Sequence, residues 1–540
     1  MLLSGTRYAG APAIKVADGW TLERLTPQSR LYGANGLRTG PDGRVYIAQV
    51  TGSQITALDV GTGELEVISP KGGDIISPDD VAFDPAGNLY ATEVMEGRVS
   101  VRGTDGATRV LRGDLPNANG ITVHQGRLLV GECRVGGRLL ELDPATGSIV
   151  AVIAENVVMP NAMEVGPDGL LYYPVMGLNE IWRVSLDGGE PQRVASGGLL
   201  AVPDSVKFDS AGFLVSTQVH SGMVVRIDPR TGEQALLAQL SPGLDNLTLA
   251  GGRLLASNFT GEIREVLADG ESRSVLPGGL NWPLDLAVGA GGELYIADGT
   301  FFYVLEAGAL KTLAMLFSEN YPGFIRGLIP AGPGEFVVTT ANGEVSWYRP
   351  SSAAKEDLAT GLDQPYGVAA SPGWTRAGGG HLAVVEQGTG RLLSVQGGTV
   401  SELATGLHAP IAVISWHNGQ WLVSESGAGR IVAVSPGGTD TVVDGLDQPN
   451  GLLLDGGLLY VVDSGSKELL AVDLETGARA VIASDLPVGA PPGVTPRPLK
   501  GMPPFSGPQG PFAGLAAGPD GRLYVAADAE GSVLAIRKAG

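Results

Sequence analysis

The sequence predicts an all-β protein made of two six-bladed β-propellers in tandem, in which each blade is a four-stranded antiparallel sheet. Three observations lead to this fold class. Glycine accounts for 82 of the 540 residues and proline for 36, which is typical of many short elements joined by tight turns. Pairs of short apolar strands, separated by turns such as Pro-Asp-Gly, recur twelve times. These copies follow one another at a nearly constant interval.

The interval is measured from a reference residue, two positions before the first apolar residue of each copy. It runs from 39 to 45 residues, with one longer step of 63 before the last copy. A period near 40 is typical of propeller blades. Because propellers have roughly four to eight blades, twelve copies divide into two rings of six, and we place the domains at residues 29–280 and 281–540. The reference residues are 35, 79, 119, 161, 204, 245, 284, 326, 366, 411, 450 and 513.

Two features concern the second propeller alone. The long last step contains a Pro/Gly-rich segment, residues 487–511, which predicts an extended loop. The last copy then has only three strands, whereas residues 19–26 alternate like a strand and have no blade of their own. We therefore expect residues 19–26 to supply the outer strand of the last blade, because this pairing would remove an open sheet edge.

Composition excludes several classes of partner and cofactor. A formal charge of −21 argues against binding to nucleic acid or to an anionic membrane. The single cysteine, Cys133, excludes an internal disulfide and Cys-based zinc sites. No segment resembles a signal peptide or a membrane span, which predicts a cytoplasmic location. The motifs of dinucleotide, P-loop and Gly-x-Ser-x-Gly enzymes are missing, so we expect a small-molecule substrate without a nucleotide or flavin cofactor. Nothing in the sequence indicates the oligomeric state.

The reference residues enter the innermost strand of each blade and should face the central channel. In the first half all are Asn or Asp: Asn35, Asp79, Asn119, Asn161, Asp204 and Asp245. In the second half they share no chemistry: Leu284, Arg326, Tyr366, Ile411, Asn450 and Ala513. Turn-forming Asn and Asp would recur equally in both halves. Converging carboxylate and amide oxygens are instead the ligands that a hard cation needs, so the first channel is predicted to bind a divalent metal, Ca²⁺ or alternatively Mg²⁺.

The repeated phrases resemble the SMP-30/gluconolactonase family and, more distantly, the paraoxonases, strictosidine synthases and NHL-repeat propellers. Pro160-Asn161-Ala162 and Pro203-Asp204-Ser205 are similar to the Pro-Asn-Gly and Pro-Asp-Gly turns that hold a divalent metal in gluconolactonase-type enzymes. Ala118-Asn119-Gly120-Ile121 is similar to a paraoxonase metal turn. The resemblance thus implies a metal held by Asn119, Asn161 and Asp204, with Asp79 close by. One departure is that Gly33-Ala34-Asn35-Gly36-Leu37 stands where the family supplies a metal-binding Glu.

The residues that end the second strand of each copy form a second set of candidates, on the same face. Glu93 or Glu132 could replace the missing Glu, and Asp204 or His220 could activate water. A lone His at such a position is more often a surface residue without a role. Gln49 and Gln218, with Asn35 and Asp245, are candidates for substrate binding. In the second half the corresponding acids are interpreted as caps of backbone amides: Asp298, Glu386, Glu425 and Asp463.

These features favour a metal-dependent hydrolase of a lactone or related ester. Two alternatives remain open: a metal-dependent lyase or isomerase, and a non-catalytic binding or scaffold double propeller. The second ring is expected to be structural or to modify access, although Arg326, Tyr366 and the loop at 487–511 could contact an anionic or aromatic ligand.

Overall fold

The computed structural model of the chain is built from β-strands. It describes residues 2–3, 5–8, 10, 12–502, 505–506, 510 and 512–539. Among these residues there are twelve antiparallel sheets and no α-helix. The helical segments are three single 3₁₀ turns: η1 (Met176–Leu178), η2 (Pro350–Ser352) and η3 (His417–Gly419). No helix in the described part of the chain has the length and apolar character that a membrane span needs. The predicted all-β class and the four-stranded repeat are confirmed.

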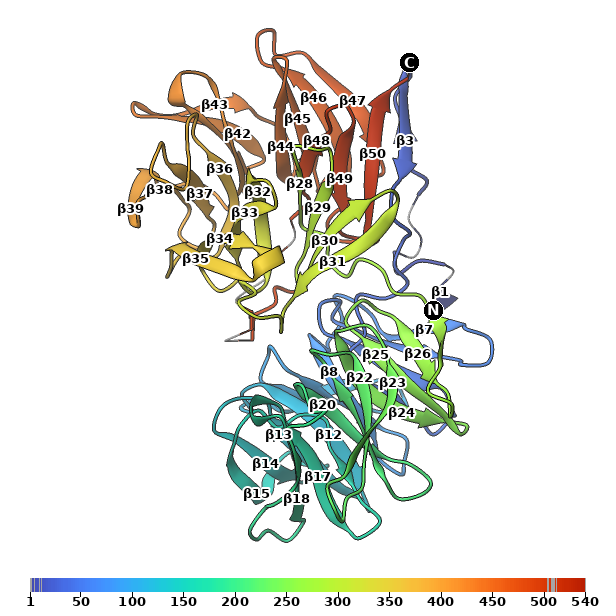
Figure 1. The fold of residues 1–540 in the computed structure, drawn as a ribbon. Helices are drawn as coiled ribbons and strands as arrows, with labels where there is room; N and C mark the ends of the chain where they lie inside the picture. The colour runs from blue at the N-terminus through green and yellow to red at the C-terminus, as the bar shows by residue number, and fades with distance from the viewer. Residues whose placement is uncertain are drawn as a thin grey trace. The chain divides into compact units, whose positions relative to one another are not determined.

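The chain divides into two compact units. Unit 1 comprises Met1–Arg7 and Ser29–Gly279, and unit 2 comprises Tyr8–Gln28 and Leu280–Gly540. Six of the sheets described above lie in each unit, and the strands of each sheet follow one another from the innermost to the outermost. Figure 1 shows the sheets of each unit arranged around a common centre, which is consistent with a β-propeller.

The sheets of unit 1, each given from its inner strand outward, are β4 (Leu37–Thr39), β5 (Val45–Gln49), β6 (Gln54–Leu58), β7 (Leu65–Ser69) and β1 (Leu2–Leu3); β8 (Pro78–Phe83), β9 (Leu89–Glu93), β10 (Arg98–Arg102) and β11 (Thr108–Arg112); β12 (Ala118–His124), β13 (Arg127–Glu132), β14 (Gly137–Leu142) and β15 (Ile149–Val157); β16 (Glu164–Val165), β17 (Leu170–Val175), β18 (Glu180–Ser185) and β19 (Gln192–Ser196); β20 (Pro203–Phe208), β21 (Leu214–Gln218), β22 (Met223–Ile227) and β23 (Gln234–Gln239); and β24 (Leu244–Ala250), β25 (Arg253–Asn258), β26 (Ile263–Val266) and β27 (Ser272–Leu276).

The sheets of unit 2, in the same order, are β28 (Asp285–Val288), β29 (Leu294–Asp298), β30 (Phe301–Glu306) and β31 (Ala309–Met315); β32 (Ile325–Gly332), β33 (Glu335–Thr340), β34 (Val345–Arg349) and β35 (Ala354–Ala359); β36 (Pro365–Ala370), β37 (Leu382–Glu386), β38 (Arg391–Gln396) and β39 (Thr399–Ala404); β40 (Pro410–Ser415), β41 (Trp421–Glu425), β42 (Arg430–Ser435) and β43 (Gly438–Val443); β44 (Pro449–Asp455), β45 (Leu458–Asp463), β46 (Glu468–Asp473), β47 (Arg479–Ser484) and β2 (Lys15–Val16); and β48 (Leu515–Ala517), β49 (Leu523–Ala527), β50 (Ser532–Lys538) and β3 (Trp20–Arg24).

The innermost strands of each unit lie beside one another, and the last lies beside the first, β24 beside β4 and β48 beside β28. The backbone carbonyl of the reference residue helps to join neighbouring sheets. The carbonyl of Asp79 accepts a hydrogen bond from Gly36 N at 2.7 Å, and in unit 2 that of Ala513 accepts one from Gly451 N at 3.0 Å. A Cβ atom at either glycine would collide with that carbonyl. The close approach of the inner strands therefore requires glycine after the reference residue at these positions.

Three short N-terminal strands complete sheets whose other strands come from later in the chain. β1 pairs with β7 in unit 1, and β2 pairs with β47 in unit 2. β3 pairs antiparallel with β50, in a register that runs from Trp20 opposite Lys538 to Arg24 opposite Leu534 (Figure 1). Arg24 also forms an ion pair with the buried Glu530 at 2.8 Å. β3 therefore covers the outer edge of the sheet that contains β48, β49 and β50.

The hydrophobic core lies between successive sheets rather than at one centre. In unit 1, for example, one cluster joins Tyr90 and Val99 of the second sheet to Leu128 and Leu140 of the third. Residues of this kind alternate along each strand with side chains that face the other side of the sheet. Each sheet is thus buried on both faces, which fixes the inner strands and the side chains that project from them.

Candidate metal centre and active site

The six reference residues of unit 1 lie at or just before the starts of its inner strands. Asp79, Asn119, Asp204 and Asp245 lie in β8, β12, β20 and β24, and are 3 to 7% exposed. Asn35 lies two residues before β4 and is half-buried, and Asn161 lies three residues before β16. We call these six side chains the inner ring of unit 1.

Hydrogen bonds connect the inner ring in pairs. Asn35 Nδ2 donates to Asp245 Oδ2 at 3.0 Å, and Asn161 Nδ2 donates to Asp204 Oδ2 at 2.9 Å. Two oxygens of the ring, Asn119 Oδ1 and Asp204 Oδ1, are buried and have no hydrogen-bond partner among the described residues. A buried oxygen that lacks a donor costs free energy unless something else binds it.

The acids of the inner ring destabilise one another's charged forms. Burial and the nearby Asp80 raise the pKa of Asp79 to about 7. Burial, followed by repulsion from Asp79 and Asp80, raises the pKa of Asp204 well above its usual range. The pKa of Asp245 is raised in the same way, by burial and by the charges of Asp204 and Asp79. The ring therefore needs either protons or a cation to offset its negative charge.

A divalent cation fits this donor set. Carboxylate and amide oxygens without Cys or His are the ligands of Ca²⁺ or Mg²⁺ rather than Zn²⁺. The structure offers the two unpartnered oxygens of Asn119 and Asp204 for this purpose. In the part of the chain that is described, no three His, Cys, Asp or Glu side chains could hold an ion by themselves. An ion at this place would therefore have to use amide oxygens, such as those of Asn119 and Asn161, beside the acids.

The raised pKa values predict how the stability of unit 1 depends on pH. In the unfolded chain these acids lose their protons near their usual pKa of about 4. In the folded protein Asp79 keeps its proton up to about pH 7, and Asp204 and Asp245 also keep theirs to a higher pH than in the unfolded chain. The stabilisation that the raised pKa values contribute is thus complete below about pH 4, and it is lost as the pH rises through the pKa values of the folded protein. In chelator, the melting temperature of unit 1 should fall between about pH 5 and pH 8. Calorimetry with and without added Ca²⁺ checks this, because a bound cation should reduce the fall; a flat profile in chelator would contradict the charge cluster.

Seven of the residues that end second strands form backbone caps, three in unit 1 and four in unit 2. Glu93 Oε2 accepts from Ile76 N at 2.6 Å, and Gln49 Oε1 accepts from Tyr32 N at 2.8 Å. Gln218 Oε1 does the same for Ala201 N at 2.8 Å. Asp298, Glu386, Glu425 and Asp463 of unit 2 cap the equivalent loops. All seven side chains hold the loop before the inner strand, so this position has the same structural role in both units and not a separate functional role in unit 1.

Glu93, Glu132 and His220, the predicted catalytic candidates beside Asp204, form no described hydrogen bond with the inner ring. Glu93 forms an ion pair with Arg98 at 2.6 Å. Glu132 is fully buried and forms ion pairs with Arg138 at 2.5 Å and Arg134 at 3.2 Å. His220 lies on an exposed turn, where its backbone N donates to Ala201 O. No contact described for these three side chains reaches an acid of the inner ring.

Replacing Glu93 with alanine should therefore lower stability rather than chemistry. The change leaves Arg98 and the amide of Ile76 without their buried partner, which costs about 3–5 kcal/mol. The expected result is a lower melting temperature of unit 1 with unchanged turnover per folded molecule, measured by calorimetry beside an assay on the folded fraction. Loss of turnover at an unchanged melting temperature would restore Glu93 as a catalytic candidate.

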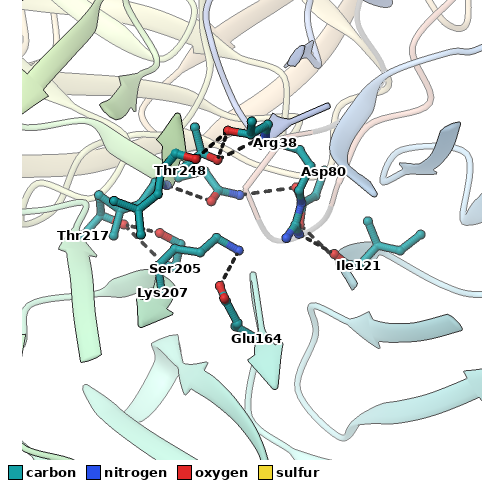
Figure 2. A network of polar contacts seen from close by, with 12 residues as sticks. Arg38, Asp80, Ile121, Glu164, Ser205, Lys207, Thr217 and Thr248 are labelled. Carbon is teal, nitrogen blue, oxygen red and sulfur yellow. Dashed lines mark hydrogen bonds and ion pairs between the residues drawn. The ribbon is translucent and has the colours of Figure 1, made fainter. Parts of the chain in front are cut away.

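Sequence reasoning missed a second polar layer, further along the inner strands (Figure 2). Arg38 donates to the carbonyls of Val81 at 2.9 Å and Ile121 at 2.8 Å, and lies 3.7 Å from Asp80. Lys207, only 5% exposed, forms an ion pair with Glu164 at 3.0 Å. Burial lowers the pKa of Lys207, as does repulsion from Arg38. The available signal was position, since Arg38, Glu164 and Lys207 each follow a reference residue by three.

Fold and site together define an all-β repeat protein with an oxygen-lined inner ring in its first unit. Residues 14–251 match the family model described as the SMP-30/Gluconolactonase/LRE-like region. The resemblance inferred from the turns is therefore confirmed over residues 14–251.

The chain is also similar to solved structures at low sequence identity. A streptogramin B lyase structure shares 18% identity at a TM-score of 0.39, with 52% of this chain and 94% of that chain covered. A gluconolactonase from Xanthomonas campestris shares 17% identity at a TM-score of 0.38, with 46% of this chain and 92% of that one covered. A virginiamycin B lyase from Staphylococcus aureus shares 17% at 0.38, with 52% and 96% covered. No curated protein matches the sequence.

Proposed function

We propose that residues 29–280 and 281–540 each form a six-bladed β-propeller, and that the first is a divalent-metal-dependent hydrolase of a lactone or related ester. The observation that carries the proposal is the pair of buried, unpartnered oxygens of Asn119 and Asp204 within a ring of mutually repelling acids. The family match over residues 14–251 supports the reaction class.

Asn119, Asn161 and Asp204 would hold the ion. Asp204 is suited to this role because Asn161 Nδ2 occupies its Oδ2, which leaves Oδ1 free to bind. Asn35 fixes Asp245 in a similar way. A bound divalent cation polarises the carbonyl group of the substrate and stabilises the negative charge that develops on its oxygen.

Asp79 is the ring acid that we assign as proton acceptor. No hydrogen bond to its carboxylate is found among the described residues, whereas Asp204 and Asp245 each accept one from an Asn of the ring. Asp79 would accept a proton from water as the water oxygen bonds to the carbonyl carbon. It would return that proton to the ring oxygen of the lactone when the C–O bond breaks, so the product is a hydroxy acid.

Of the four predicted substrate contacts, Asn35 and Asp245 remain available. Asn35 is half-buried, and both side chains belong to the inner ring. Gln49 and Gln218 are fully buried and cap backbone amides, so they are not available to a substrate.

An activity screen tests the proposal. The purified protein is assayed against a panel of γ- and δ-lactones and aryl esters, first in chelator and then after adding back Ca²⁺ or Mg²⁺. We expect hydrolysis that is lost in chelator and restored by one of the ions. Calcium binding without turnover of any panel member would favour the binding-protein alternative, and turnover that is indifferent to chelator would contradict the metal-dependent reaction.

A further inference from the structure

The inner ring of unit 2 contains one buried charge without an ionic partner. Its six reference residues are at most 2% exposed, and five of them are uncharged. The sixth, Arg326, is among the largest fully buried side chains of the chain. Buried arginines are normally paired with a carboxylate.

The surroundings of Arg326 satisfy only part of its guanidinium group. Its Nη1 lies 3.4 Å from the carbonyl of Pro365, and the group stacks over the Tyr366 ring at 4.3 Å. Its Nη2 is buried and has no hydrogen-bond partner, and no ion pair of Arg326 is found in the described part of the chain. Asp363 acts on it electrostatically without reaching ion-pair distance. Among the described residues, Arg326 thus has a free donor at Nη2 and no carboxylate at ion-pair distance.

Two further polar atoms of the same ring lack partners. Tyr366 Oη and Asn450 Oδ1 are buried and have no hydrogen-bond partner in the described part of the chain. The amide nitrogen of Asn450 donates to Gln448 O and Ser464 Oγ. Three orphaned polar atoms in one ring of six are unusual, because buried polar groups in proteins are nearly always bonded.

A cavity adjoins Asn450, and an apolar side chain packs against Tyr366. A cavity of about 200 Å³ is lined by Asn450 and Ile411 of the ring, together with Gln387, Gln448 and their neighbours. The Tyr366 ring also meets Phe512 edge-on at 6.0 Å. The ring therefore combines one cation, one hydroxyl and one amide oxygen with apolar side chains.

We propose that the inner ring of unit 2 is a binding site for a small hydroxy acid. Arg326 Nη2 binds the carboxylate, the hydroxyl of Tyr366 donates a second hydrogen bond to it, and Asn450 Oδ1 accepts one from a hydroxyl group of the ligand. A single negative charge suits the site, because a doubly charged phosphate would leave excess charge among apolar side chains. Lactone hydrolysis would release such a compound, but the inference depends on unit 2 alone and needs no metal in unit 1.

Binding to the intact protein tests the proposal, with chelator present throughout. The probes are 4-hydroxybutyrate, butyrate, and inorganic phosphate as a control anion. Calorimetric titration and scanning calorimetry should show that 4-hydroxybutyrate binds and raises the melting temperature of unit 2. Butyrate should bind more weakly because it leaves Asn450 Oδ1 unpaired, and phosphate more weakly still.

Variants distinguish a ligand site from a structural arginine. Arg326→Met should lower the affinity for 4-hydroxybutyrate about 10- to 100-fold and yet raise the melting temperature of the ligand-free protein, because it removes a buried unpaired charge. Tyr366→Phe should weaken binding about 10-fold at an unchanged ligand-free melting temperature. The matched control is Arg430→Met. Arg430 is paired with Glu425, so its loss should lower the melting temperature and leave binding intact.

Three results would overturn the proposal. One is that none of the probes binds the wild type. Another is that binding persists in Arg326→Met while its ligand-free melting temperature falls, which would make Arg326 structural. The third is that phosphate binds as well as 4-hydroxybutyrate, which would indicate a general anion site.

Discussion

Asp204→Ala is expected to remove the calcium-dependent stabilisation of unit 1 and to abolish lactone turnover. Asp204 contributes a formal charge and the unpartnered Oδ1 to the inner ring, so its loss removes the strongest single ligand of the proposed site. At a free Ca²⁺ concentration of 100 times Kd, binding stabilises the wild type by about 2.7 kcal/mol, a shift of several degrees. The variant should melt at the same temperature in Ca²⁺ and in chelator, and its kcat should fall about 100-fold or more.

Two further variants show whether this effect belongs to the site. Asp187→Ala removes the same formal charge from a side chain that is 91% exposed, and should leave both the calcium response and turnover unchanged. Asn161→Asp keeps a ligand oxygen and adds charge, so calcium should still bind while turnover falls. An Asp204→Ala protein that keeps the full calcium shift would exclude Asp204 as a ligand.

Removing residues 1–28 should destabilise unit 2 much more than unit 1. The deletion exposes the edge of β50 and removes Arg24 and Gln28, so that of the three side chains that bind Glu530 only Ser532 is left. It also removes the hydroxyl of Thr26, which accepts from Val533 N at 2.9 Å. A buried Glu530 without its ionic partner Arg24 costs about 3–5 kcal/mol. The transition of unit 2 should therefore fall by about 10 °C, measured by scanning calorimetry.

Shorter changes separate the contributions to this loss. Deleting only residues 1–7, which belong to unit 1, should leave the transition of unit 2 in place. Adding Glu530→Gln to the longer deletion should restore part of the stability, because it removes the unpaired charge. A larger fall in unit 1 than in unit 2 after the longer deletion would contradict the importance of the pairing between β3 and β50.

Repetition made much of the fold predictable. Every copy has similar turn residues between its strands, so the interval near 40 residues located the start of each inner strand. The all-β class and the four-stranded repeat could be predicted from the same pattern. The same register brought Asn35 to Asp245 and Asn161 to Asp204, although these residues are far apart in the sequence.

The side chains at the ends of the second strands were harder to interpret. Glu93 and Glu132 sit at the correct end of the sheet, but the neighbouring loop and nearby arginines bind their carboxylates. Periodicity specifies the face of a strand and does not specify the partner that a long side chain reaches. The equivalent acids of unit 2, such as Asp463, were interpreted correctly as caps because their turns suggested that role. Lys207 escaped notice because a lone lysine in a strand normally faces solvent.

The path of the chain between the units has a consequence for biosynthesis. Residues 1–7 belong to unit 1, and residues 8–28 supply β2 and β3 to unit 2. The rest of unit 1, residues 29–279, is therefore synthesised before the rest of unit 2. Glu530 lies 506 residues after its partner Arg24. At roughly 5–20 residues per second, a ribosome takes about 25–100 s to cover that separation. During translation β3 therefore stays unpaired while unit 1 can already fold. In that interval β3 can pair with a strand of another nascent chain.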